Sequence, residues 1–244
     1  MSALAHYLEE AGIATVAISL VRPQSERTRP PRALWVPFEL GRPFGPPSDA
    51  KFQTRVVLHA LSMLESPNGP VTIEDFPEDD PRAEPDLSWQ APANHSVTAS
   101  ASIRDLANAL KTEIRQLTER YRLVVARRQG RTTVGLSGLT IEAAGDYVAR
   151  FLSGEVTDSP SPDLSPPLAL RYAVDDLKAY YTEAASAGAG EPSSRQLGDW
   201  FWNGTTAGAA IHVLRQSHLM SEDERLKFIA TLFIVPGARV PPAG

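Results

Sequence analysis

The feature that most constrains the fold is a helix, a glycine and a buried strand in immediate succession near the start of the chain. Leu4, Leu8 and Ala11 recur at helical spacing, and Gly12 closes the helix. Residues 13–20 (IATVAISL) are almost all apolar, which is typical of a strand buried on both faces of a parallel sheet. This order predicts one half of a doubly wound, Rossmann-like α/β unit.

A second strand and a second helix extend this unit. The strand is expected over 33–37, and a loop over 38–47 leads to a helix over 51–65 that Ser48 or Asp49 caps. The β-α-β order implies parallel pairing with right-handed crossovers. Two strands are too few for a sheet that stands alone. Further strands are therefore expected from the C-terminal part, a second copy of the chain or a different subunit.

The middle of the chain differs in composition from both flanks. Between Val71 and Gln90 seven acidic residues face Arg82 alone, which accounts for the net charge of −5. This stretch is also rich in proline and has no clear periodicity, so we interpret it as a surface connector and a domain boundary. The predicted domains are a Rossmann-like α/β segment (1–66), an acidic proline-rich connector (67–100) and a mainly helical part (101–244).

The helical part is predicted from apolar residues at helical spacing and from capping patterns. A short hairpin is expected from two strands at 122–126 and 132–136. The expected helices are 102–120, 140–152, 168–186, 195–217 with a break at Asn203–Gly204, and 222–234.

Composition excludes several kinds of chemistry. The chain contains no Cys, so it forms no disulfide and offers no thiolate nucleophile, zinc–thiolate site or iron–sulfur ligand. No apolar run approaches the roughly 18 residues of a membrane span, and the acids Glu9 and Glu10 stand where a signal peptide needs apolar residues. We therefore expect a soluble protein in the cytoplasm.

Two stretches carry a resemblance to a known family. They are Leu8–Val16 (LEEAGIATV) and Pro31–Gly45 (PRALWVPFELGRPFG), the second followed by Gln53 and an apolar helix to Leu64. Together and in this order they resemble the C-terminal end of the substrate-reducing subunit of the glycine/sarcosine/betaine reductase and D-proline reductase family (the selenoprotein B group). The resemblance covers about a quarter of the chain, and it implies an α/β fold and one wall of a substrate pocket.

The chain departs from that family at the reacting residue. In the family a selenocysteine or cysteine precedes the helix of the first stretch and attacks the substrate. This chain starts within that segment and has no Cys, so no position corresponds to the nucleophile. The resemblance therefore implies a subunit whose redox or metal centre lies on a partner chain. No cofactor and no metal are expected on this chain, and its catalytic residues stay unknown.

The best candidate site is the loop after the second strand. Open α/β sheets bind ligands at the carboxyl ends of their strands. In this loop Glu39 and Arg42 are ionisable, and Gly41 and Gly45 permit close approach of a ligand to the backbone. Arg42 is suited to hold a carboxylate, and the following helix offers N–H groups to an anion. The alternative interpretation is that the glycines only shape a long loop.

Three other groups of residues have structural interpretations that we prefer. The histidines, whose spacing gives no metal-binding pair, are interpreted as surface or core-edge residues. The aromatic groups Tyr180–Tyr181 and Trp200–Trp202 are interpreted as a helix–helix core or subunit contact, and a substrate box is the alternative. Asp175 and Asp176, with Glu183 and Asp199, lack the Glu-x-x-His partners of a di-metal site. The histidines are His6, His59, His95, His212 and His218.

The segment 104–131 carries eight basic residues, which suit either a solvated helix face, an acidic partner or phosphates. Because the chain is acidic overall and shows no recognition motif, we expect no nucleic-acid partner.

Three functional hypotheses follow. The first is an accessory or substrate-binding subunit of a hetero-oligomeric, oxidoreductase-like enzyme, which implies a second protein subunit or a homo-oligomer and a small-molecule substrate. The second is a self-sufficient, non-redox enzyme that uses Glu39, Arg42 and a histidine for acid–base chemistry. The third is a nucleic-acid-associated protein.

Overall fold

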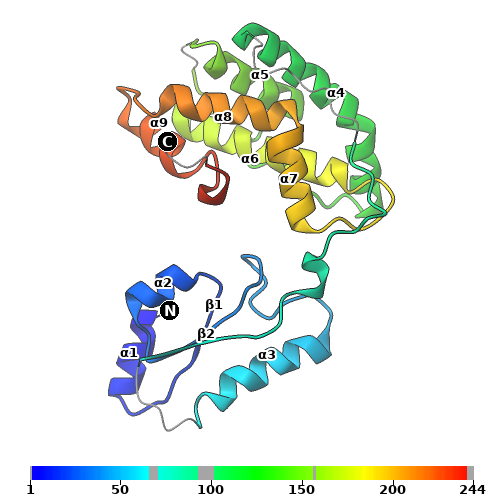
Figure 1. Cartoon of the computed structure of the whole chain (residues 1–244). Helices are drawn as coiled ribbons and strands as arrows, with labels where there is room; N and C mark the ends of the chain where they lie inside the picture. Colours follow the sequence, from blue (N-terminus) through cyan, green and yellow to red (C-terminus); the bar gives the residue numbers. More distant parts are fainter. Residues whose placement is uncertain (1, 66–70, 93–101, 156–157, 241–244) are drawn as a thin grey trace. The chain divides into compact units, whose positions relative to one another are not determined.

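A computed structural model of the chain describes residues 2–65, 71–92, 102–155 and 158–240. Within them the protein is a mixed α/β structure, with a parallel sheet near the N-terminus followed by a series of helices, as predicted (Figure 1). The chain divides into two units, Met1–Glu84 and Pro85–Gly244. We call them the sheet unit and the helical unit.

The sheet unit is built on three strands in the order β1-β2-β3, and both pairs are parallel. Ser19, Trp35 and Asp75, the last residues of the three strands, stand side by side in register. The elements are α1 (Ser2–Glu10), β1 (Ala17–Ser19), α2 (Arg22–Thr28), β2 (Arg32–Trp35), α3 (Ala50–Ser62), β3 (Thr72–Asp75) and the 3₁₀ helix η1 (Pro81–Ala83).

The two faces of the sheet are covered differently, because side chains alternate along a strand. Leu34 packs with Phe52 and Val56 of α3 in the core of this unit. Trp35 points to the other face, where the guanidinium of Arg22 lies 5.5 Å from the centre of its ring. α3 therefore closes one face, and α2 lies against the other.

The third strand comes from the stretch that the sequence assigned to the acidic connector. Thr72–Asp75 pairs with β2, so residues 71–84 belong to the sheet unit, and the unit boundary falls between Glu84 and Pro85. The strand ends in two acidic residues, Glu74 and Asp75, so a search for apolar runs does not detect it. β1 is also shorter than predicted, Ala17–Ser19 in place of 13–20, because the short β2 pairs with only these residues.

The helical unit is arranged around α6, which contacts α4, α5, α7 and α9 (Figure 1). Tyr180 and Tyr181 of α6 are fully buried in its core. The elements are α4 (Ile103–Arg127), α5 (Ile141–Leu152), α6 (Pro166–Ala185), α7 (Ser194–Gly204), α8 (Thr206–His218), α9 (Glu224–Leu232) and the 3₁₀ helix η2 (Gly237–Arg239).

One prediction in this unit was wrong and two are confirmed. No hairpin forms, because α4 continues to Arg127 and residues 132–136 are a loop. The last helix, predicted over 222–234, is confirmed as α9, and Asp223 is its N-cap and accepts from the amides of Arg225 and Leu226. The break at Asn203–Gly204 is confirmed, because α7 ends at Gly204.

A buried carboxylate of α4 fixes the start of α8. Glu113 accepts hydrogen bonds from the amides of Thr206 and Ala207, both at 3.1 Å, and from the Tyr181 hydroxyl at 2.8 Å. These amides belong to the first turn of α8, and the amides of a helix's first turn have no intrahelical acceptor. Burial raises the pKa of Glu113, and the hydrogen bonds oppose that rise. Glu113 thus joins three helices at one point.

The lengths and compositions of the helices bear on membrane insertion. Within the described ranges, no helix is long and apolar enough to cross a bilayer.

The α7–α8 corner gives a test of the helical unit. We expect Gly208→Ala to destabilise it by about 3 kcal/mol, because the added methyl group would overlap the carbonyl of Phe201 and the backbone of Trp202. Gly237→Ala is the control, since nothing lies within 4 Å of its added methyl group, and we expect a change within about 0.5 kcal/mol. Urea unfolding followed by helical circular dichroism measures both, and equal losses would contradict this packing.

Candidate functional site

The carboxyl ends of the three parallel strands meet at one edge of the sheet, where open α/β sheets bind ligands. Arg22, at the start of α2, donates hydrogen bonds to Asp75 at the end of β3 and, at 2.8 Å, to Glu26. These two bonds raise the pKa of Arg22, and the bond to Asp75 is the larger cause. Ser25 donates to Ser19 at 2.6 Å. Polar side chains from β1, α2 and β3 therefore gather at this edge.

The predicted loop begins at the same edge and is held by the core beneath it. Phe38 leaves β2 and packs edge-to-face on Phe52, with ring centres 5.5 Å apart. The chain then makes two successive turns, in which the amide of Arg42 donates to Glu39 O and the amide of Gly45 donates to Arg42 O, both at 3.0 Å. Two hydrogen-bonded turns therefore shape the loop.

The structure brings Glu39 and Arg42 together and adds a third residue. Nη1 of Arg42 lies 3.9 Å from Oε2 of Glu39 and 4.0 Å from Oδ2 of Asp80. These distances are too long for hydrogen bonds, and the guanidinium donates to no residue that the structure describes. The Arg42 side chain is 41% exposed, whereas that of Asp80 is 7% exposed. An arginine with unused donors thus lies between two carboxylates, and we call these three residues the Arg42 cluster.

Sequence reasoning missed Asp80. It lies in the acidic run that was interpreted as a solvated connector, yet its side chain is buried. Its carboxylate accepts the amide of Arg82 at 2.8 Å and caps η1. The Asp-Pro-Arg order at 80–82 is the one local signal of a capped turn at this place.

The two glycines of the loop have different roles. Both have positive φ, +93° at Gly41 and +83° at Gly45. A side chain at Gly45 would overlap the ring of Phe52, whereas nothing lies within 4 Å of one at Gly41. Gly45 is therefore required by core packing, and only Gly41 leaves its backbone open to a ligand.

The helix behind the loop does not offer a free anion site as expected. Asp49 is the N-cap of α3 and accepts the amide of Phe52 at 3.0 Å, so its own carboxylate occupies that place. The side chain of Gln53 donates to Pro46 O at 2.9 Å and fixes the end of the loop to the helix. The Asp49 carboxylate therefore disfavours an anion at the N-terminus of α3.

His6 and His59, the histidines of the sheet unit, do not join the Arg42 cluster. His59 lies 3.4 Å from Glu74, and His212 and His218 are in the helical unit against Trp202 and Phe151. His95 lies outside the described residues. Among the residues that are described, no three His, Asp or Glu side chains are grouped as a metal site requires.

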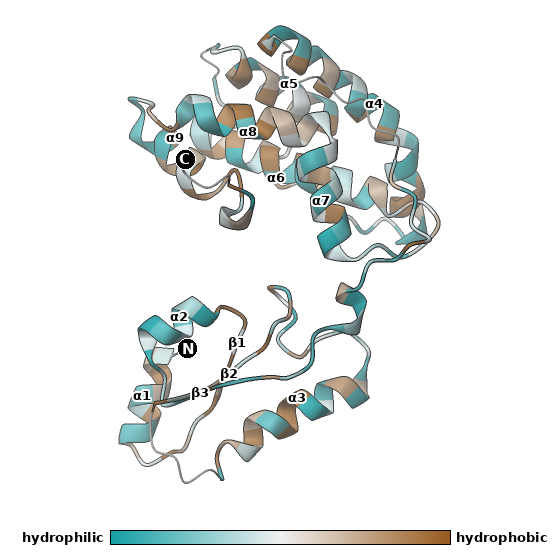
Figure 2. Cartoon of the chain, viewed as in Figure 1, coloured by the Kyte–Doolittle hydropathy of each residue, from teal (hydrophilic) through white to brown (hydrophobic). Residues whose placement is uncertain are grey.

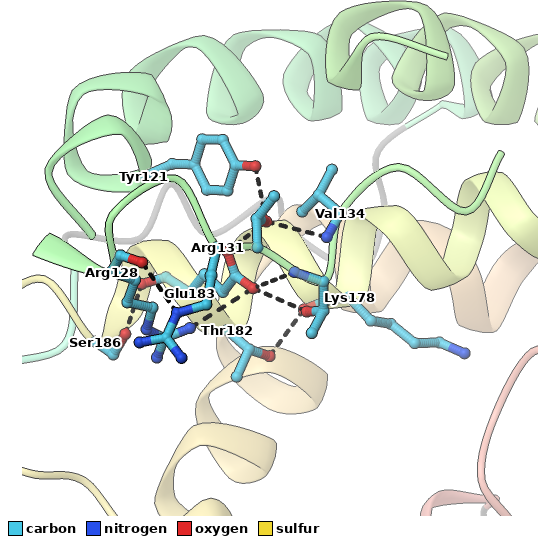
Figure 3. Close-up of polar contacts among 10 residues, drawn as sticks. Tyr121, Arg128, Arg131, Val134, Lys178, Thr182, Glu183 and Ser186 are labelled. Carbon is cyan, nitrogen blue, oxygen red and sulfur yellow. Dashed lines mark hydrogen bonds and ion pairs between the residues drawn. The ribbon is translucent and has the colours of Figure 1, made fainter. Parts of the chain in front are cut away.

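Two of the four carboxylates considered for a di-metal site, Asp176 and Glu183, instead hold the loop between α4 and α5. Figure 3 shows the contacts of Glu183. Glu183 accepts from the hydroxyls of Thr132 and Thr133 at 2.7 and 2.8 Å, and Arg128 lies 3.6 Å away. Asp176 lies about two helical turns before Glu183 on α6. Its carboxylate accepts hydrogen bonds from three successive loop amides. Two buried carboxylates of one helix thus fix this loop.

Basic residues near Glu183 line two small hollows of about 330 and 350 Å³, which share Arg128, Thr133 and Glu183. Arg120 and Arg127 donate to the carbonyls of Ala184 and Ala187. These arginines tie α4 to the end of α6, so this part of the basic segment has a structural role. Burial lowers the pKa of nearby Lys178, and the carboxylate of Asp175 at 3.0 Å opposes that shift.

The aromatic groups form a core, as preferred. Trp200 and Phe201 are buried, and the ring of Tyr181 lies 5.6 Å from that of Phe201.

Comparisons of the chain with models of protein families, with curated proteins and with solved structures gave no match.

The two glycines test the loop geometry. We expect Gly41→Ala to cost about 1 kcal/mol, because alanine is strained at positive φ. Gly45→Ala has the same strain and also displaces Phe52, so we expect a loss of about 2–3 kcal/mol. Thermal melts of both variants measure the difference. Equal losses would mean that Gly45 does not pack on Phe52 as described.

Proposed function

We propose that the chain is an accessory, substrate-binding subunit of a hetero-oligomeric, oxidoreductase-like enzyme in the cytoplasm, whose redox or metal centre lies on a partner chain. In this proposal the sheet unit is part of a larger Rossmann-like sheet. The resemblance of Leu8–Val16 and Pro31–Gly45 to the glycine and D-proline reductase family favours the same reading. The observation that carries the proposal is that the guanidinium of Arg42 lies near the carboxylates of Glu39 and Asp80 and donates to no residue that the structure describes.

The first support is the incompleteness of the sheet unit. Among the described residues, β1 and β3 each pair on one side only. Helix α3, which includes hydrophobic stretches along its ribbon (Figure 2), also exposes apolar side chains. Val57, Leu58 and Leu61 are 37, 59 and 49% exposed. Free strand edges and exposed apolar surface are typical of a segment that pairs with another chain.

The second support is the Arg42 cluster at the carboxyl edge of this sheet. A guanidinium presents a planar set of donors that matches a carboxylate, and those of Arg42 are unused among the described residues. Two carboxylates within 4.0 Å of it repel a simple anion and attract a cation. The cluster therefore suits a small zwitterion, whose carboxylate would meet Arg42 and whose ammonium group would meet Glu39.

The self-sufficient enzyme is the less supported alternative. Acid–base chemistry needs a general base within hydrogen-bond reach of its proton, and within the sheet unit neither His6 nor His59 contacts Glu39 or Arg42. Turnover by the isolated chain that is lost in Glu39→Gln would favour this alternative.

Substitution of Arg42 tests the binding role. We expect Arg42→Ala to weaken the binding of glycine or proline, measured by calorimetry, by about tenfold or more, because the carboxylate loses its paired donors. The melting temperature should stay within about 1 °C, since a half-exposed arginine without hydrogen bonds adds little stability. The control is Arg27→Ala, an exposed arginine of α2, which should change neither.

Two results would contradict the proposal. Unchanged binding in Arg42→Ala would remove the cluster as a site. A parallel loss of binding and stability would give Arg42 a structural role.

A further inference from the structure

The helical unit contains a surface groove between the start of α6 and α9. Its cavity volume is about 800 Å³, within the range of about 300–1,000 Å³ that is typical of ligand sites. The lining is Ser165, Leu168, Arg171, Glu224, Arg225, Lys227, Phe228, Ile229, Thr231, Leu232 and Phe233.

The floor of the groove is apolar and open. Phe228, Leu232 and Phe233 are 55, 58 and 36% exposed, and the rings of Phe228 and Phe233 are 5.5 Å apart. Three large apolar side chains that share one concave surface are unusual, because exposed apolar residues are normally scattered singly. The floor therefore favours a ligand with a long apolar part.

The rim of the groove is cationic. Arg171, Arg225 and Lys227 line it against the single acidic residue Glu224, which pairs with Lys227 at 3.4 Å. The guanidinium of Arg171 lies 4.1 Å from the centre of the Phe233 ring, and its Nε is buried without a hydrogen-bond partner. Asp175 lies 3.7 Å from that Nε and balances part of the charge. The Nε atom itself is buried and faces Asp175, but the Arg171 side chain as a whole is 34% exposed. The exposed part of its guanidinium, at the junction of rim and floor, is therefore the part that would meet an anionic head group.

We propose that this groove binds a free fatty carboxylate, with the acyl chain on Phe228 and Leu232 and the carboxylate at Arg171 and Arg225. The floor requires an apolar chain, and the excess of cationic over acidic side chains at the rim selects an anion over a neutral alcohol. The proposal is independent of the substrate-binding role of Arg42, because all lining residues belong to the helical unit.

The test is equilibrium dialysis of the full chain with dodecanoate below its micelle concentration, beside dodecanol and butyrate. We expect saturable binding of dodecanoate that is about tenfold tighter than that of either analogue, since each analogue lacks one half of the recognition. The double variant Phe228→Ser/Leu232→Ser should weaken binding by about tenfold or more and keep the fold, because both side chains are exposed. Arg171→Gln/Arg225→Gln should remove the preference over dodecanol.

The control is Leu123→Ser, which changes a leucine of α4 that is 54% exposed and outside the groove. It should leave dodecanoate binding unchanged. Three results would overturn the proposal: no saturable binding by the wild-type chain, equal binding by the floor variant, or binding only to vesicles of anionic phospholipid. The last result would assign the groove to a membrane surface instead of a free carboxylate.

Discussion

The parallel pairing of β2 with both of its neighbours is the constraint on which the sheet unit depends. It places Ser19, Trp35 and Asp75 in register, so the chain leaves three strands at one edge. The loop after β2, the start of α2 and the segment after β3 must then share that edge. Residues that are distant in sequence, such as Arg42 and Asp80, are brought to within 4.0 Å for this reason.

Burial separates the structural carboxylates from those available for binding. Asp176 and Glu183 are 1 and 4% exposed, and backbone amides and hydroxyls fill their acceptor positions. Removing a buried ion from water is costly unless it is paired, so these groups are committed to the fold. Glu39 has 46% of its side chain exposed and meets Arg42 at 3.9 Å without a hydrogen bond. It can exchange this partner for a ligand.

Periodicity predicted most of the helices, and the β-α-β order predicted the parallel pairing. Neither revealed contacts between segments distant in sequence. The last turns of α4 were predicted as a strand, because residues 122–126 are mostly apolar and include two adjacent β-branched valines. β3 was missed because its acids resemble a solvated run. For the candidate site, Glu39 and Arg42 were proposed from their place after a strand. Asp80 was not, because its burial depends on a crossover that no local pattern encodes.

The central claim is that the sheet unit is completed by another polypeptide. Native mass spectrometry of the tagged chain, purified from its own host at endogenous level, tests it most directly. The account predicts a complex in which the 26.5 kDa chain is joined by a second polypeptide of different mass. A clean monomer of 26.5 kDa with no companion would contradict it.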